Sequence, residues 1–301
     1  LKKTRRSKYL PSDTRGVFKS IKIDLDKGKK VLFTGVPCQN AAIRTFLQRE
    51  YENLYTCEII CHGVPSKKVF DSYIQETEEY YADKVVSINF RDKSHGWNNN
   101  YIHVKMMEHE VLCSSVIHPF HSGYLKGLYT MDSCLDCKYA TINRNSDIVL
   151  ADFWKYDGEL LGEYKKAGIS LVYCVTSKGE MLLEWAKEKY LQVEDTTEES
   201  AVLSCKHLTT SPSGSGKEDR INFWYLFDKY GFFISRYLCT KNLFGKTFLL
   251  RVFHLKVSEK NIEQLFRNFL IYWQGSKWIK LVSRYRSRVR DIVKRIFGGI
   301  R

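Results

Sequence analysis

The chain has 301 residues, 44% hydrophobic and 27% charged, so it is not a disordered, collagen-like or low-complexity sequence. Its formal net charge of +14 sits at the two ends: residues 1–30 hold 11 basic and 3 acidic side chains, and residues 251–301 hold 13 and 3. The residues between carry 24 basic and 28 acidic side chains, which argues against a basic groove for nucleic acid through the core.

The cysteine content and the absence of targeting signals indicate a reducing compartment. No run of about eighteen apolar residues predicts a transmembrane helix, and no apolar run follows the basic N-terminus as in a secretory signal. Nine cysteines are an odd number and are not spaced as a disulfide framework. We expect a cytoplasmic protein in which some cysteines serve as ligands or redox groups. Because the sequence begins at Leu1 and not Met, we also expect it to be truncated at the N-terminus.

The first part of the chain alternates predicted strands and helices. Apolar runs predict buried strands at 29–35 and 54–60. Helical spacing follows the first strand after Gln39, with Ala42, Ile43, Phe46 and Leu47 on one face, and follows the second strand after Ser66. This order is typical of parallel α/β units, in which ligands gather at the carboxyl ends of the strands. We therefore predict a mixed α/β fold, with parallel strand–helix units around a cofactor site and a helical C-terminal extension.

The middle of the chain is less regular. We predict strands at 85–90, 101–107, 147–152 and 170–176, a short helical piece near 124–128, a helix at 178–190 and a loop at 209–219. Beyond this loop we expect helices. The predicted domains are residues 1–205, holding the cofactor site, and residues 206–301, a helical region that ends in a basic amphipathic helix.

Four cysteines stand out by their positions. Cys134 and Cys137 form a C-x2-C pair that suits zinc, an iron–sulfur cluster or a thiol-redox pair. Cys38 and Cys61 follow two neighbouring predicted strands, and four thiolates collected in this way suit a cubane cluster. Alternatively, Cys38 could be a nucleophile beside His62, but no Asn or Asp is placed to complete a catalytic triad. The remaining five lie in apolar or mixed runs and are expected to be inert thiols: Cys57, Cys113, Cys174, Cys205 and Cys239.

Four motifs around these cysteines occur together in one order. They are Phe33–Gln39 (FTGVPCQ), Ile60–Ser66 (ICHGVPS), Ser133–Cys137 (SCLDC) and Ser146–Trp154 (SDIVLADFW). In this series the sequence resembles the beta-subunit family of coenzyme F420 hydrogenases and dehydrogenases, over roughly residues 7–185, and looks like a bacterial member.

The resemblance implies a 4Fe–4S flavoprotein that relays electrons between its cluster, FAD and an acceptor such as coenzyme F420 or a ferredoxin-linked substrate. The implied partner is a ferredoxin-like electron donor or another redox subunit. The implied cluster ligands are Cys38, Cys61, Cys134 and Cys137. The implied lining of the cofactor pocket is Thr34, Gly35, Gln39, His62 and Gly63, with Arg144, Asp147 and Asp152 on its other side. Gly35 and Gly63 would permit close approach of the backbone to a cofactor.

Two other functions compete with this one. Relatives of the family occur in bacterial surface-polysaccharide gene clusters, so a non-catalytic accessory protein that retains the fold is the alternative. A zinc-stabilised thiol enzyme is the second. Separately, an apolar stripe within residues 278–296 with basic residues around it predicts an amphipathic helix, which either packs on its own domain or contacts an anionic membrane surface.

Overall fold

The computed structural model describes residues 7–239, apart from residues 98, 157, 160, 213 and 215. The predicted basic helix at 278–296, with its membrane contact, therefore lies outside the described residues. The chain divides into two compact units. One comprises residues 1–67, 86–105 and 110–214, and the other comprises residues 68–85, 106–109 and 215–301. The boundary that we predicted after residue 205 stays a prediction.

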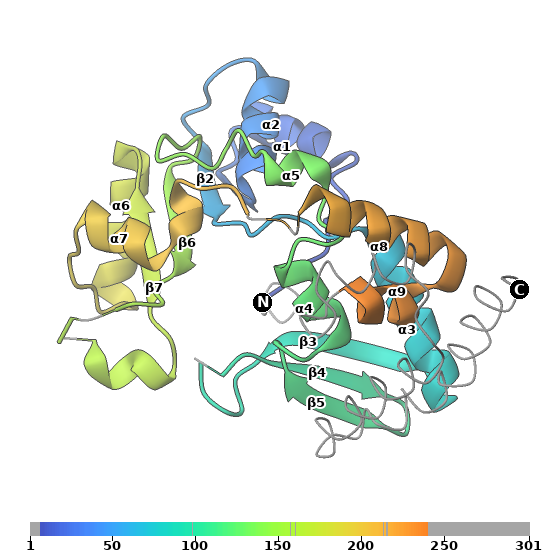
Figure 1. Ribbon diagram of the computed structural model, residues 1–301. Helices are drawn as coiled ribbons and strands as arrows, with labels where there is room; N and C mark the ends of the chain where they lie inside the picture. The colour runs from blue at the N-terminus through green and yellow to red at the C-terminus, as the bar shows by residue number, and fades with distance from the viewer. Residues whose placement is uncertain are drawn as a thin grey trace, which may run out of the picture. The chain divides into compact units, whose positions relative to one another are not determined.

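A four-stranded sheet forms the centre of the first unit (Figure 1). Its strands lie in the order β1 (Val31–Gly35), β2 (Leu54–Ile59), β6 (Ile148–Asp152) and β7 (Ser170–Cys174). The first three are parallel, and β7 is antiparallel to β6. With helix α2 (Pro37–Leu47) between β1 and β2, this sheet confirms the predicted mixed α/β fold.

Two apolar clusters hold the helices of this unit against the strands. One joins α1 (Val17–Asp26), which we did not predict, and α2 to β1 and β2 through Leu25, Phe33, Ile43, Leu47 and Leu54. The other lies around β6 and β7, near α6 (Ser177–Lys189) and α7 (Glu198–Ser204), and contains Val149, Phe153, Leu171 and Leu208. Ile43 and Leu47 lie on the predicted apolar face of α2 and are buried, whereas Phe46 on the same face is exposed.

The first unit also contains most of a second sheet, in the order β3 (Val85–Asp92), β4 (Tyr101–Met106) and β5 (Glu110–Ser114). The third strand was not predicted; it is a five-residue strand that pairs antiparallel with β4. Helix α4 (Pro119–Leu125) begins before the helical piece predicted near 124–128. Pro119 occupies its first turn, and the His118 Nδ1 accepts a hydrogen bond from the His121 N–H at 3.1 Å, so the helix is capped five residues earlier.

The second unit contains three described helices, α3 (Lys67–Tyr81), α8 (Lys217–Tyr230) and α9 (Phe232–Cys239). Helix α8 begins inside the predicted loop at 209–219. The Glu76 carboxylate of α3 accepts hydrogen bonds from the N–H groups of Phe232 and Phe233, at 2.5 and 3.0 Å, and so caps α9. The region after the loop is thus helical as predicted, as far as residue 239.

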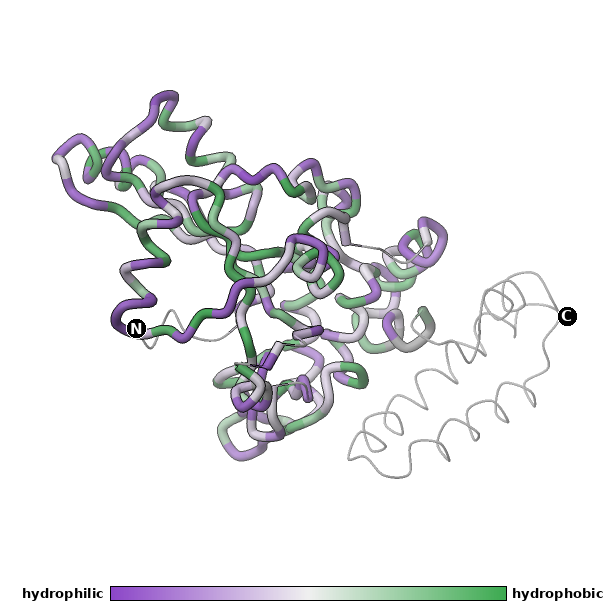
Figure 2. Tube along the Cα trace, turned by 90° about the vertical axis from the view of Figure 1, so that its left-hand side faces the viewer, coloured by the Kyte–Doolittle hydropathy of each residue, from purple (hydrophilic) through white to green (hydrophobic). Residues whose placement is uncertain are grey.

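Within residues 7–239, no helix combines the length and hydropathy needed to cross a membrane. Colouring by hydropathy shows hydrophilic residues interrupting the hydrophobic ones along the whole described trace (Figure 2).

A single carboxylate joins three elements of the first unit. Asp147 precedes β6, and its Oδ2 accepts hydrogen bonds from the backbone N–H and the hydroxyl of Thr56 in β2, both at 2.7 Å. Its Oδ1 accepts the hydroxyl of Thr176, the N-cap of α6, at 2.8 Å. Asp147 is 4% exposed, so these bonds replace the water that a carboxylate would otherwise bind.

We expect Asp147→Ala to lower the free energy of unfolding by about 3 kcal/mol, because it leaves buried donors without an acceptor. Urea denaturation measures this change. Asp195→Ala, at an exposed position, is the matched control and should change stability by less than about 0.5 kcal/mol. Equal effects of the two substitutions would show that Asp147 does not join the elements.

Candidate functional site

The four cysteines singled out in the sequence come from three loops. Cys38 lies in the first turn of α2, directly after β1, and Cys61 lies two residues after β2. Cys134 belongs to the short helix α5 (Asp132–Leu135), and Cys137 follows it. Because β1 and β2 are parallel neighbours, their carboxyl ends meet at one edge of the sheet.

A short antiparallel contact brings the second and third loops together. Pro65 forms a β-bridge with Thr130, the Ser66 N–H donates to the Tyr129 carbonyl at 2.8 Å, and the Met131 N–H donates to the Val64 carbonyl at 2.9 Å. These bonds fix the residues after Cys61 against those before Cys134. The two cysteines are thereby held at one place, although 73 residues separate them in the sequence.

The thiols are close enough to influence one another electrostatically. The pKa of Cys61 is raised to about 12, mainly by burial and to a smaller extent by negative charge on Cys134, Cys38 and Cys137. The pKa of Cys38 is also raised, first by desolvation of its thiol and then by charge on Cys134 and Cys137. The structure therefore brings all four predicted ligands into one neighbourhood, which we call the four-thiol site.

Four thiolates are a donor set known both from single-ion zinc sites and from iron–sulfur clusters. Among the described residues, no three His, Cys, Asp or Glu side chains are placed to hold one metal ion. In a cubane cluster each thiolate binds a different iron, so its sulfurs stand farther apart than around one ion. The donor set, four thiols from three loops, fits a 4Fe–4S cluster in number and chemistry.

Backbone donors surround two of these sulfurs. The Gly63 N–H donates to the Cys61 Sγ at 3.3 Å. The N–H groups of Cys38 and Gln39, in the first turn of α2, act on the Cys38 sulfur and partly offset the rise in its pKa. Such donors stabilise negative charge on sulfur, which is the charge that a cluster ligand carries.

A buried ion pair lies beneath the four-thiol site. The Arg144 Nη1 donates to the Glu58 Oε1 at 2.9 Å, and both side chains are 1% exposed. The guanidinium also donates to the carbonyls of Tyr139, at 3.0 Å, His207, at 3.3 Å, and Leu208. The resemblance implied that Arg144 lines a cofactor pocket. In the structure it ties the segment after Cys137 and the segment at 207–208 to β2, so it acts as a positioning residue.

The sequence analysis missed the segment at 207–212. The His207 Nε2 lies 2.7 Å from the Nδ1 of His62, and the Ser211 hydroxyl accepts the N–H of Cys137 at 2.9 Å. Pro212 lies beside Gly63. Only the Ser, Pro and Gly residues of a predicted loop marked this segment, and loop composition does not reveal which site a loop covers.

Gly35 and Gly63 are close to the protein's own side chains. A Cβ on Gly63, whose φ is +87°, would lie 2.7 Å from the Thr130 Cγ2 and 3.3 Å from the Cys134 Cβ. A Cβ on Gly35 would lie 3.1 Å from the Oε1 of Gln39, and that amide in turn accepts the Val36 N–H at 3.1 Å and caps α2. The close approach at both glycines is therefore explained by packing within the chain.

The remaining residues implied by the resemblance lie apart from one another. The exposed Thr34 lies in β1, where its hydroxyl bonds the Cys57 thiol and partly offsets the rise that burial causes in the pKa of that thiol. Asp147 lies at the amino end of β6, and Asp152 lies at the carboxyl end of the same strand. There the Asp152 Oδ2 accepts the Arg91 Nη1 at 2.5 Å. Of the two aspartates, only Asp152 lies at the strand end that carries the cysteines.

The other cysteines are distributed through the fold. All nine are free thiols; Cys57, Cys113 and Cys205 are buried, and Cys174 and Cys239 are half-buried.

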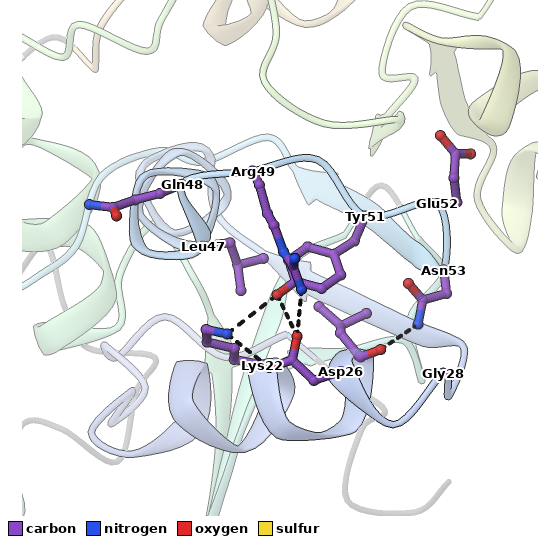
Figure 3. Close-up of a pocket in the computed structure, with 10 residues that line it drawn as sticks. Lys22, Asp26, Gly28, Leu47, Gln48, Arg49, Tyr51, Glu52 and Asn53 are labelled. Carbon is purple, nitrogen blue, oxygen red and sulfur yellow. Dashed lines mark hydrogen bonds and ion pairs between the residues drawn. The ribbon is translucent and has the colours of Figure 1, made fainter.

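A separate pocket lies at the other end of the strands from the four cysteines, near the amino ends of β1 and β2 (Figure 3). Its Asp26 carboxylate accepts hydrogen bonds from Lys22, Arg49 and Tyr51 at 2.7–2.8 Å.

The part of the chain that contains the four cysteines also matches a known protein family. The family described as the C terminus of the coenzyme F420 hydrogenase/dehydrogenase beta subunit matches residues 28–199, more than half of the chain. The chain belongs to this family. Membership assigns it to proteins of oxidation–reduction and electron transfer, and confirms the resemblance seen in the four motifs.

Comparison with curated proteins and with solved structures adds little about the site. The search of curated proteins gave no match. Among solved structures, the chain is similar to one in the xenon-derivatised F420-reducing NiFe hydrogenase complex from Methanosarcina barkeri, at 15% identity. The similarity covers 74% of this chain and 71% of that chain, with a TM-score of 0.41.

We expect Arg144→Met to destabilise the protein by about 3–5 kcal/mol, because it leaves the Glu58 carboxylate buried without its partner. Adding Glu58→Leu should restore most of this loss, since the pair is then replaced by apolar groups. Denaturant unfolding of the single and double variants measures both effects. Arg15→Met, which breaks an exposed ion pair with Asp13, is the control and should have little effect. A double variant as unstable as Arg144→Met would contradict this account.

We expect the protein to become less stable as the pH is lowered, partly because of His121. Burial lowers the pKa of this residue from 6.5 to about 4, so the unfolded chain takes up a proton at a pH where the folded chain does not. The contribution is present above pH 6.5 and is lost as the pH falls toward 4, by at most about 3 kcal/mol. Urea unfolding between pH 7 and 4 should therefore show a shallower decline for His121→Gln than for the wild type. His95→Gln, at an exposed position, should leave the decline unchanged; identical slopes in all three proteins would refute the assignment.

Proposed function

We propose that this protein is an iron–sulfur flavoprotein oxidoreductase. It binds one 4Fe–4S cluster through Cys38, Cys61, Cys134 and Cys137, uses FAD, and passes electrons to an acceptor such as coenzyme F420 or a ferredoxin-linked substrate. A ferredoxin-like protein or a partner redox subunit supplies the electrons, in the reducing cytoplasm. The observation that carries the proposal is the collection of four thiols from three loops at one edge of the sheet.

The chain's own residues prepare the site for a cluster. Because the pKa of the Cys61 thiol is raised to about 12, this thiol would have to lose its proton to serve as a cluster ligand. The Gly63 N–H would stabilise the charge on that sulfur. Arg144 and Ser211 hold the third loop, which carries Cys134 and Cys137, in place.

Family membership supports FAD as the second cofactor. A flavin exchanges single electrons with a cluster and a hydride with an organic acceptor. The close packing of Gly35 and Gly63 against their own neighbours does not provide a cradle for it, so the flavin is not assigned to these two glycines.

Cluster reconstitution tests the ligand set. Protein purified and reconstituted without oxygen should contain about four irons and four sulfides per chain, with a broad visible absorbance that dithionite bleaches. Cys137→Ser should lose most of this iron and absorbance. Cys174→Ser is the matched control, because Cys174 is a half-buried free thiol in β7 outside the four-thiol site, and it should retain both.

The same samples separate the competing functions. Stoichiometric FAD that is reduced by dithionite and reoxidised by an added acceptor supports the enzyme. A bound cluster without flavin would favour the accessory protein, and colourless protein with one zinc would favour the thiol enzyme. An intact cluster in Cys137→Ser would refute the ligand set.

A further inference from the structure

A stretch of chain beyond the family match lies against the four-thiol site. We call residues 207–212 the clasp; it follows helix α7 in the chain (Figure 1). The region that matches the family ends at residue 199, so the match does not account for the clasp. The clasp contacts the second and third loops, which carry three of the four cysteines.

Two residues of the clasp lie against the second loop. The His207 ring packs edge-on to that of His62, next to Cys61, with the ring centroids 4.6 Å apart and a nitrogen of each ring 2.7 Å from the other. Pro212 is buried, and a Cβ on Gly63 would stand 3.5 Å from its Cγ. The clasp therefore contacts the residues that directly follow the Cys61 thiol.

The third loop is contacted by the residues at the far end of the clasp. The Ser211 hydroxyl accepts the Cys137 N–H at 2.9 Å and donates to the carbonyl of the same residue at 3.5 Å. Just beyond the clasp, a Cβ on Gly214 would lie 2.9 Å from the side chain of Leu135, which stands between the two cysteines of this loop. The segment thus runs along the third loop as well.

The two ends of the clasp are held to different extents. At its start, Leu208 is 1% exposed within an apolar cluster, and the Arg144 guanidinium donates to the carbonyls of His207 and Leu208. At its other end, the hydroxyl of Ser211 makes neutral hydrogen bonds, and residues 209–212 lie in neither a helix nor a strand. Because neutral hydrogen bonds are weaker than charged ones, the second half of the clasp is the part that opens more readily.

The exposure of the thiols follows the contacts of the clasp. Cys38, in the first loop, is exposed, whereas Cys61, Cys134 and Cys137 are half-buried. The two loops that the clasp contacts are therefore those whose thiols are less accessible. A segment that is anchored at one end and lightly held at the other can uncover such a site without unfolding of the domain.

We propose that the clasp is a gate of the four-thiol site. Residues 211 and 212 move away while residues 207 and 208 stay anchored, and this local opening sets the rate at which metal ions, a cluster or thiol reagents reach and leave Cys61 and Cys137. The proposal rests on the proposed function only in taking an iron–sulfur cluster as the natural occupant. Shielding of the two thiols is a property of the metal-free chain as well, and can be measured there.

Alkylation of the reduced, metal-free full chain by N-ethylmaleimide tests the gate, with each cysteine followed separately by mass spectrometry. Ser211→Ala should speed the labelling of Cys137 by about five- to tenfold, because loss of one hydrogen bond raises the population of the open clasp by about that factor. Ser211→Thr, which keeps the hydroxyl, should restore the slow rate. Each cysteine is compared with itself in the wild type, so differences in thiol pKa between cysteines cancel.

Ser204→Ala is the matched control. The Ser204 hydroxyl also accepts a backbone N–H at 2.9 Å, that of Lys155, but it lies outside the clasp. This variant should leave the labelling of the four-thiol site unchanged. Two other cysteines serve as internal references: Cys38, which is exposed, should label at the wild-type rate in every variant, and Cys57, which is buried in β2, reports unfolding of the whole unit.

Pro212→Gly is a second variant, directed at the second loop. Removing the ring that lies against Gly63 should speed the labelling of Cys61 by a similar factor. Wild-type rates at Cys61 and Cys137 in the two clasp variants would overturn the proposal. Equal acceleration at Cys57 would also overturn it, since the site would then open only when the unit unfolds.

Iron release separates the gate from the proposed function. In reconstituted samples, Ser211→Ala should lose its bound iron to a ferrous chelator about five- to tenfold faster than the wild type, measured as a rate constant. A wild type that binds no cluster but shows the gated alkylation refutes only the proposed function. A full cluster with unchanged alkylation rates in the variants refutes only the gate.

Discussion

The buried pair of Glu58 and Arg144 is the constraint on which the four-thiol site depends. Glu58 lies near the end of β2, three residues before Cys61, and Arg144 follows the loop of Cys134 and Cys137. Two charges that are 1% exposed are tolerated only together, so the third loop cannot leave the strand without exposing or isolating a charge. The Nη2 of the guanidinium bonds to the carbonyls of His207 and Leu208 and extends this constraint to that segment.

The two loops at the strand ends need no such pair, because the sheet itself positions them. Parallel pairing of β1 with β2 sets Cys38 and Cys61 at the same edge, and the start of α2 at Pro37 determines where the first thiol stands. The site thus combines two kinds of positioning. Backbone pairing holds two of the cysteines, and an ion pair with a short β-bridge holds the other two.

The sequence predicted those features that depend on local pattern. The strands β1, β2, β6 and β7 and the helices α2 and α6 have strong apolar periodicity, and the four cysteines were recognisable from their positions after strands and from their motifs. Strand β5 has five residues and was missed, and α4 was placed too late because a cap at His118 was not considered.

The sequence did not predict contacts between residues that are far apart in the chain. Nothing near Arg144 shows that its partner is Glu58, 86 residues earlier, and the pattern around His207 gives no sign of His62. Asp147 belongs to the same motif as Asp152, yet the length of a strand separates them. A motif places residues along the chain, whereas which of them face one site depends on pairing that only the folded chain reveals.

The antiparallel contact between Pro65 and Thr130 has a consequence for biosynthesis. The four-thiol site draws on residues from Cys38 to Ser211, and contacts between such distant segments form late in folding, after local strands and helices. A ribosome-bound chain that has emerged only as far as β2 presents Cys38 and Cys61 without the other two thiols. A cluster at this site would therefore require a nearly finished domain, and the two early cysteines would have to wait for the third loop to fold.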